Sequence, residues 1–160
     1  MLLAFTLFHV ALSLAGIGAG FVVVYGLLVS KMYDGWTKLF LITTVATSIT
    51  GYMFPAHKIT PGHVLGFLSL IVLTFAILGR YHYRLAGSWR RTYAITAVVA
   101  LYLNVFVLIV QLFEKVPALK ALAPRQSDPP FEVAQLGALV IFALVAVMAA
   151  VKFHGEPVHA

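Results

Sequence analysis

The chain has 160 residues, of which 62% are hydrophobic and only 10% are charged, and its mean hydropathy is +1.00. A soluble domain carries about 25% charged residues, so this composition excludes a soluble globular protein and predicts one embedded in a membrane. The lack of cysteine in the sequence excludes disulfides, thiolate metal sites and cysteine nucleophiles. The net charge of +6 comes from basic residues between apolar segments, where they contact lipid headgroups rather than nucleic acid.

Five apolar segments are long enough to form membrane-spanning helices, which predicts an all-α helical bundle in a single domain over residues 1–160. The expected spans are residues 2–29, 37–54, 62–80, 92–113 and 132–153. An odd number of spans places the two termini on opposite sides. Most lysines and arginines lie in the loops after the first and third spans and in the C-terminal tail, which predicts an outer N-terminus and a cytoplasmic C-terminus in a bacterial inner membrane.

The first span contains a close-packing face built from Gly16 and Gly20. Small residues at this spacing let helix backbones approach closely in lipid, so the face is a candidate contact with another helix, a partner protein or a second copy of the chain. His9 lies on the same side of the helix. A histidine inside a span indicates either a functional site or a buried hydrogen bond, and both interpretations stay open.

The stretch from residue 41 to residue 63 has the most unusual pattern in the chain. When its residues are placed at about 100° each, hydroxyl side chains occupy one face of a helix and apolar side chains occupy the other. The hydroxyl face consists of Thr43, Thr44, Thr47, Ser48 and Thr50, and the apolar face includes Ile42, Ile49 and Met53. One face therefore suits lipid and the other suits protein or a polar cavity. The stretch then breaks at Pro55 and brings His57 and His63 to a membrane surface.

In the predicted orientation, most polar residues of the spans map to the outer half of the bundle. We predict that seven of them line an outward-facing pocket above an apolar floor: His9, Thr47, Thr50, His63, Asn104, Gln111 and Gln135. Such a pocket would bind, sense or pass a small polar or amphiphilic solute. The alternative is that the hydroxyl face and Asn104 hold helices together, because polar groups buried in lipid need partners. Thr43 and Thr44 lie deeper in the membrane than these seven residues and are assigned to contacts between helices.

Two other functions stay open. In the first, the protein is a non-catalytic accessory subunit of a larger membrane complex. In the second, it is an electron-transfer protein that uses haem b or a quinone. His9 and His63 are the candidate axial ligands of haem b, and with His57 they form a weaker candidate metal site. The sequence shows no phosphate-binding loop, dinucleotide-binding fingerprint, nucleophile elbow or zinc-protease motif. This pattern favours a role without catalysis.

The loops between the spans carry charged and aromatic residues with predictable roles. Asp34 precedes the second span and is expected to cap its N-terminus. Arg84, Arg90 and Arg91 lie in a basic aromatic loop and are expected to contact lipid headgroups. The long loop over residues 114–131 is rich in proline and contains a segment, VPALKAL, that predicts a short interfacial helix.

Three segments carry a resemblance to known sequences. They are YLNVFVLIVQLFEKVPALKALAPRQSDPPF over residues 102–131, the DGW that precedes the second span and the GYMFPAH that follows it. With these segments the chain is similar to a group of small bacterial multi-pass membrane proteins, and the resemblance covers most of its length. The resemblance implies a multi-pass membrane protein and brings no activity, cofactor or site residue with it.

Overall fold

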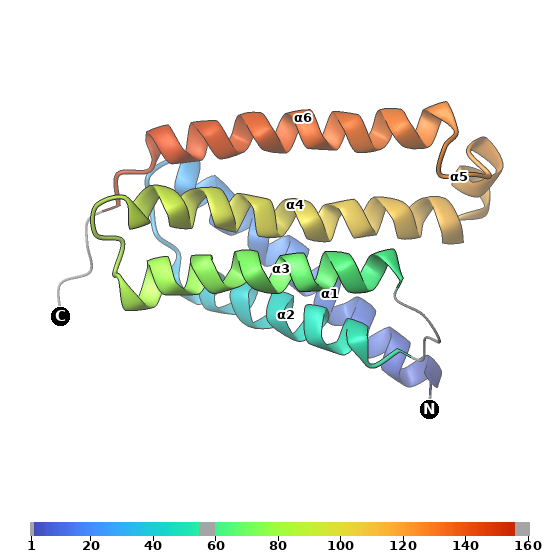
Figure 1. Cartoon of the computed structure of the whole chain (residues 1–160), viewed down its shortest axis with the longest axis horizontal. Coiled ribbons are helices and arrows are strands. Elements are labelled where there is room, and N and C mark those ends of the chain that lie inside the picture. Colours follow the sequence, from blue (N-terminus) through green and yellow to red (C-terminus); the bar gives the residue numbers. More distant parts are fainter. Residues whose placement is uncertain (1, 55–59, 156–160) are drawn as a thin grey trace.

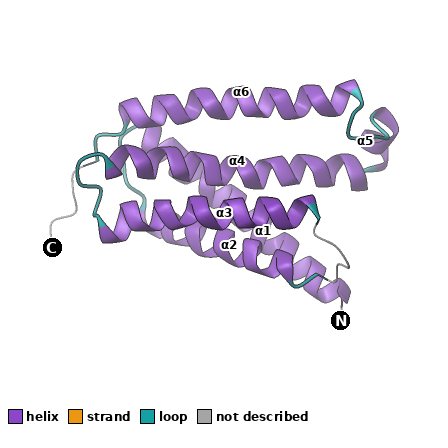
Figure 2. Ribbon diagram, viewed as in Figure 1, coloured by secondary structure: helices purple, strands orange, loops and turns teal. Residues whose placement is uncertain are grey.

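The computed structural model describes residues 2–54 and 60–155, and this part of the chain contains helices and no strand (Figure 2). The long helices are α1 (Leu2–Leu28), α2 (Asp34–Tyr52), α3 (Pro61–Ile77), α4 (Trp89–Lys115) and α6 (Pro129–Lys152). They run up and down beside one another, with α1 crossing behind the others (Figure 1). The short helix α5 (Pro117–Leu122) lies in the α4–α6 connection and confirms the helix predicted in VPALKAL.

The two ends of the bundle differ in what they contain. The starts of α1, α3 and α6 meet the ends of α2 and α4 at one end, together with α5 (Figure 1). We call this the outer end, in line with the predicted orientation, and we call the opposite end the inner end. At the inner end α3 continues into a π-helix, η1 (Leu78–His82).

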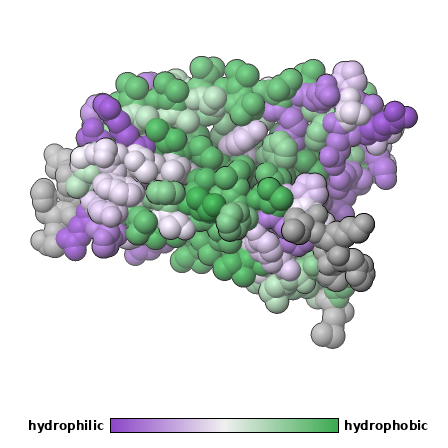
Figure 3. All heavy atoms as spheres, in the orientation of Figure 1, coloured by the Kyte–Doolittle hydropathy of each residue, from purple (hydrophilic) through white to green (hydrophobic). Residues whose placement is uncertain are grey.

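Among the described residues, four helices are long and apolar enough to cross a membrane: α1, α3 with η1, α4 and α6. Figure 3 shows apolar side chains over the middle of the bundle and hydrophilic side chains toward both of its ends. Such a belt is the pattern expected of helices that cross the hydrocarbon layer of a bilayer. The prediction of an all-α helical bundle is confirmed, and the four apolar helices indicate a membrane protein.

α2 is the expected span that does not belong to these four. Its many hydroxyl side chains lower its hydropathy, although the helix has 19 residues. A helix at the surface of a soluble protein buries its apolar side chains and exposes its polar ones. In α2 the reverse holds, because Thr44 and Ser48 are buried whereas Ile42 is 67% exposed. The predicted division of this helix into a protein-facing hydroxyl side and an outward apolar side is therefore confirmed.

The small-residue face of α1 packs against helices of the same chain. A methyl group added at Gly20 would lie 2.7 Å from Leu101 Cδ1 on α4 and 2.9 Å from Phe40 Cε2 on α2. A methyl group added at Gly16 would lie 3.0 Å from Thr43 Oγ1. The two glycines thus let α1 approach α2 and α4 at the same time. A partner protein that used this face would have to displace these helices.

An ion pair joins α2 to the end of α3 at the inner end. The guanidinium of Arg80 in η1 donates to the carboxylate of Asp34 in the first turn of α2. Asp34 was expected to cap α2, but the helix is preceded by Tyr33 and has no side-chain cap. The prediction of a cap was wrong, because the carboxylate is taken by a partner 46 residues away. Arg80 is only 7% exposed, so the cationic partner of this ion pair is largely buried.

Candidate functional site

His9 joins α1 to α2 in the outer half of the bundle. Its Nδ1 lies 2.8 Å from Thr50 Oγ1, and the Thr50 hydroxyl donates to the Ala46 carbonyl at 2.8 Å. Because a hydroxyl has one hydrogen, His9 Nδ1 is the donor and Nε2 keeps its lone pair. The Phe54 ring packs edge-on against the imidazole at a centroid distance of 5.1 Å. The structure therefore brings two predicted site residues, His9 and Thr50, into direct contact.

Asn104 lies near the middle of α4 and bonds to a different part of α2. Its Nδ2 donates to Thr44 Oγ1 at 3.2 Å, and the side chain is only 8% exposed. The sequence predicted that Asn104 would face Thr47 and Thr50, with Thr44 lying deeper. The pairing differs because α4 extends to Lys115, which puts residue 104 further from the outer end than expected. Asn104 and His9 thus belong to separate contacts.

The side chains of Thr47 and His63 form hydrogen bonds within their own segments, while the His63 carbonyl accepts from the Tyr52 hydroxyl of α2 at 2.7 Å. The Thr47 hydroxyl donates to the Thr43 carbonyl at 2.8 Å. The Thr60 N–H donates to His63 Nδ1 at 3.0 Å, and the His63 N–H donates back to Thr60 Oγ1 at 3.4 Å, so the pair forms a capping box at the start of α3. A neutral His63 ring in this arrangement carries its proton on Nε2, and iron ligation would require another tautomer.

Metal and haem ligation stay predictions. Within residues 2–54 and 60–155, no group of three or more histidine, cysteine, aspartate or glutamate side chains could hold a metal ion. The third histidine of the candidate metal site, His57, lies outside the described residues. His9 and His63 each have a hydrogen-bonded Nδ1, one on α1 and the other at the start of α3.

The two glutamines of the predicted site lie near the α4–α6 connection. Gln111 on α4 is exposed, whereas Gln135 on α6 is only 8% exposed. Gln135 Nε2 donates to the Phe106 carbonyl on α4 at 3.2 Å. Gln135 Oε1 is buried and has no hydrogen-bond partner in the described part of the chain. A buried acceptor without a hydrogen bond lowers the stability of a fold by about 1–3 kcal/mol. Gln135 is the one predicted site residue with such an acceptor in the described part of the chain.

A cavity opens at the outer end between α4, α5 and α6. Its volume is about 400 Å³. Nine residues line it: Phe113, Glu114, Lys115, Lys120, Ala123, Pro124, Arg125, Gln126 and Phe131. None of the seven predicted site residues belongs to this lining, and no motif in the sequence marks the lining residues as a site. The signal in the sequence is the loop over residues 114–131, which is longer than the usual helix connection of about 2–8 residues.

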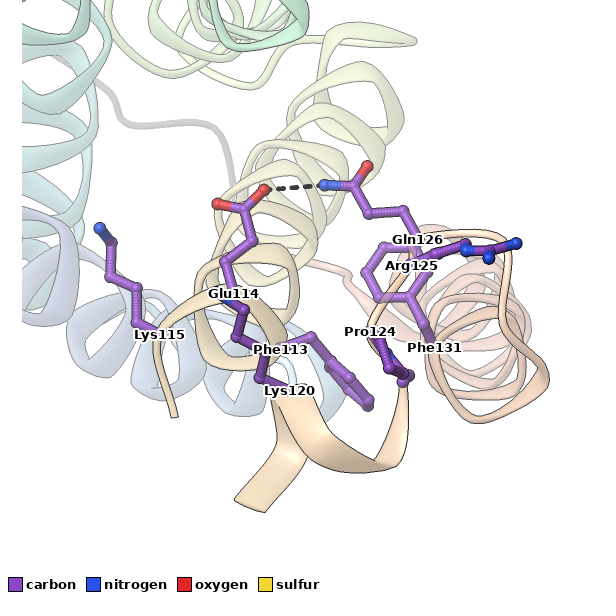
Figure 4. A pocket seen from close by; sticks show the side chains of 9 residues that line it. Phe113, Glu114, Lys115, Lys120, Pro124, Arg125, Gln126 and Phe131 are labelled. Atoms are coloured by element: carbon purple, nitrogen blue, oxygen red, sulfur yellow. Dashed lines mark hydrogen bonds between the residues drawn. The ribbon is translucent and has the colours of Figure 1, made fainter. Parts of the chain in front are cut away.

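The cavity has an apolar side and a polar side. The Phe113 and Phe131 rings meet edge to face at a centroid distance of 5.5 Å, and Phe131 is only 8% exposed. Gln126 Nε2 donates to Glu114 Oε1 at 2.9 Å, which ties the loop to the end of α4. Figure 4 shows these two polar side chains reaching toward each other beside the phenylalanines. The arrangement provides an apolar surface next to a fixed polar edge.

Basic side chains surround this cavity. Lys115, Lys120 and Arg125 belong to its lining, against a single carboxylate, Glu114. Asp128 lies outside the lining and accepts the Arg125 backbone N–H at 2.8 Å, which fixes the turn that carries the arginine. In Figure 4, Lys115 and Arg125 extend outward on opposite sides of Glu114. The cavity therefore combines an aromatic wall with a cationic rim, a combination that suits an apolar body with an anionic head.

The arginines predicted to contact lipid headgroups lie at the inner end. Arg84 and Arg91 are exposed, while Arg90 is half-buried and its Nε has no partner among the described residues. The Tyr83 and Trp89 rings stack at a centroid distance of 4.0 Å and close the loop that presents Arg84. These positions leave the guanidinium groups free of protein carboxylates within the described residues. Their contact with headgroups stays a prediction.

No protein-family model, curated protein or solved structure matches this chain.

Proposed function

We propose that the chain is a five-span membrane protein whose outer end binds a small anionic amphiphile in the cavity between α4, α5 and α6. The observation that carries this proposal is the cavity of about 400 Å³ with its aromatic wall and cationic rim. Ligand pockets commonly have volumes of about 300–1,000 Å³ and combine apolar walls with a few polar groups. The proposal keeps the outward-facing pocket predicted from the sequence and moves it from α1, α2 and α4 to the α4–α6 connection.

The fifth span in this proposal is α2, in a bacterial inner membrane with the N-terminus outside. Its buried hydroxyl face and exposed apolar face are the pattern expected of a helix that contacts lipid on one side and protein on the other. With α2 as a span, the loop before Asp34 and the loop that carries Arg84 lie on the same side of the membrane. With α2 outside the bilayer, these loops lie on opposite sides.

Cysteine labelling tests the number of spans, because the chain contains no cysteine of its own. Single cysteines are introduced at Lys31, Ala86 and Gln126, and intact cells are treated with a membrane-impermeant maleimide. We expect immediate labelling at position 126, and labelling at positions 31 and 86 only after the membrane is opened. Opposite behaviour of positions 31 and 86 would show that α2 does not cross the membrane, and labelling at 31 and 86 alone would reverse the orientation.

The chemistry of the cavity indicates how an amphiphile would bind. A carboxylate or phosphate head at the rim would contact Lys120 and Arg125, while its apolar part would lie on Phe113 and Phe131. Hydrogen bonds that lysine and arginine side chains donate to a carboxylate or phosphate are roughly twice as strong as those between neutral groups. Glu114 opposes this attraction only in part, because three basic side chains line the cavity with this one carboxylate.

Binding of a dansyl-labelled undecanoate tests the proposal. The protein is placed in nanodiscs of phosphatidylcholine, and dansyl fluorescence is followed during titration. We expect saturable binding by the unmodified chain and at least tenfold weaker binding when Lys120→Glu and Arg125→Glu are combined, since a tenfold change corresponds to about 1.4 kcal/mol. Higher salt should weaken binding by the unmodified chain because the rim is exposed.

The matched control combines Arg84→Glu and Arg91→Glu, which makes the same charge change at the inner end. This control should bind the probe as the unmodified chain does. Equal weakening by both pairs would mean that total charge, rather than the cavity, governs binding. Non-saturable uptake by every variant would mean that the probe enters the lipid and that the proposed function is wrong.

The proposed partners at the inner end are membrane lipids. Arg84, Arg90 and Arg91 would lie at the level of the headgroups of the inner leaflet, beside the stacked rings of Tyr83 and Trp89. Aromatic and basic residues are both enriched at this level of membrane proteins. The support for this assignment is the exposure of Arg84 and Arg91.

A further inference from the structure

We infer that Glu114 and Gln126 are positioning residues of the outer cavity, and that their hydrogen bond holds the Arg125 guanidinium at the rim where an anion binds. The inference rests on the proposed function and adds two residues to the binding of the anionic head. Glu114 has the same charge as the ligand, so its contribution lies in the hydrogen bond that it accepts and not in its charge.

The backbone of Arg125 is fixed by the turn that leads into α6. Its N–H donates to Asp128 Oδ2 at 2.8 Å, and its carbonyl accepts from the Asp128 N–H at 3.1 Å. Asp128 directly precedes α6, so the turn attaches Arg125 to the start of that helix. Both bonds use the Arg125 backbone, and its guanidinium forms no ion pair within residues 2–54 and 60–155.

The residue after Arg125 attaches the same turn to α4. Gln126 Nε2 donates to Glu114 Oε1 at 2.9 Å, and Glu114 lies in the last turn of α4. Figure 4 shows this bond between the loop and the helix, with the Arg125 side chain extending away from Glu114. The turn is therefore held from α6 through Asp128 and from α4 through Gln126, and these two helices form opposite sides of the cavity.

A turn held at two points presents its free side chain in an ordered way. Glu114 and Gln126 are both exposed, so their bond adds little to the packing of the bundle. An arginine whose backbone is already fixed loses less conformational freedom when it binds an anion, which raises affinity without a new contact. Loss of the Gln126 bond would let the turn move relative to α4, and the ligand would lose this advantage at Arg125.

A double-mutant cycle in the dansyl-undecanoate titration tests this dependence on Arg125. Gln126→Leu removes the donor and keeps a similar size, and it should bind the probe about fivefold more weakly, which is the scale of one hydrogen bond. Arg125→Gln alone should also weaken binding. The double variant should bind as Arg125→Gln does, because the Gln126 bond then has no guanidinium to position.

Two neutral variants of Glu114 separate its hydrogen bond from its charge. Glu114→Gln keeps an acceptor for Gln126, Glu114→Leu removes it, and both remove the same charge. We expect the glutamine variant to bind the probe about fivefold more tightly than the leucine variant. Gln111→Leu changes another exposed glutamine, on α4 and outside the cavity lining, and should bind as the unmodified chain does.

The outcomes separate the inference from the proposed function. Full affinity in Gln126→Leu, an equal loss from Gln126→Leu with and without Arg125, or equal binding by the two Glu114 variants would overturn the inference and leave the cavity function intact. Unchanged far-ultraviolet circular dichroism confirms that the variants are folded. If the unmodified chain does not bind the probe saturably, the proposed function fails instead.

Discussion

Replacing Gly20 by alanine is expected to lower the free energy of unfolding by about 2 kcal/mol, within the range known for overpacked cores. The added methyl group would lie 2.7 Å from Leu101 Cδ1 and 2.9 Å from Phe40 Cε2. Both neighbours are fully buried, so neither can move aside without disturbing α2 or α4. The measurement is reversible unfolding in mixed detergent micelles, followed by far-ultraviolet circular dichroism.

Gly18 offers a matched control on the same helix, two residues away. A methyl group added there meets no atom within 4 Å, and the position is exposed. Gly18→Ala should therefore not lower the free energy of unfolding and should raise it by up to about 1 kcal/mol, because alanine favours a helix more than glycine does. Similar losses for Gly18→Ala and Gly20→Ala would contradict the role of Gly20 as the close contact among α1, α2 and α4.

Removal of the Asp34 carboxylate is expected to have the second large effect on stability. Asp34→Asn leaves the buried Arg80 guanidinium without its anion, and loss of one partner of a buried pair costs about 3–5 kcal/mol. The Asp34 side chain is 65% exposed, so solvent screens much of this interaction. We therefore expect a loss of about 2 kcal/mol in the free energy of unfolding, measured in the same micelles.

A double-mutant cycle separates the ion pair from the two side chains that form it. Arg80→Gln alone should also be destabilising, because it removes the pair and the contact of the guanidinium with the Tyr81 ring at 5.5 Å. The double variant should lose less than the sum of the two single losses, since each single variant already breaks the pair. Strictly additive losses would show that Asp34 and Arg80 do not stabilise the fold together.

The helices themselves could be predicted from the sequence because their signals are local. Apolar length identified α1, α3, α4 and α6, and hydroxyl periodicity identified which side of α2 faces protein. These properties depend on residues within a few turns of one another. Periodicity also predicted that Thr44 faces protein, but not that Asn104 would be its partner, since pairing depends on how far each helix extends.

The site was harder to predict because its parts are joined by tertiary contacts. Nothing near Asp34 in the sequence indicates that Arg80 will reach its carboxylate. The cavity depends on how the proline-rich connection turns back, including the bond between Gln126 and Glu114. Gln135 was predicted as a site residue, but its amide bonds to the Phe106 carbonyl and it does not line the cavity.

The buried hydroxyl face of α2 bears on how the chain enters the bilayer during synthesis. An α2 helix that left the translocon alone would expose Thr44 to acyl chains without Asn104, its partner on α4. α1 is made earlier and covers part of this face through Gly16, but Asn104 arrives only when α4 has been made. In the proposed five-span arrangement, release of α2 into lipid is therefore favoured after its neighbours are present. Biogenesis of this protein should depend on helices that leave the translocon as a group rather than one by one.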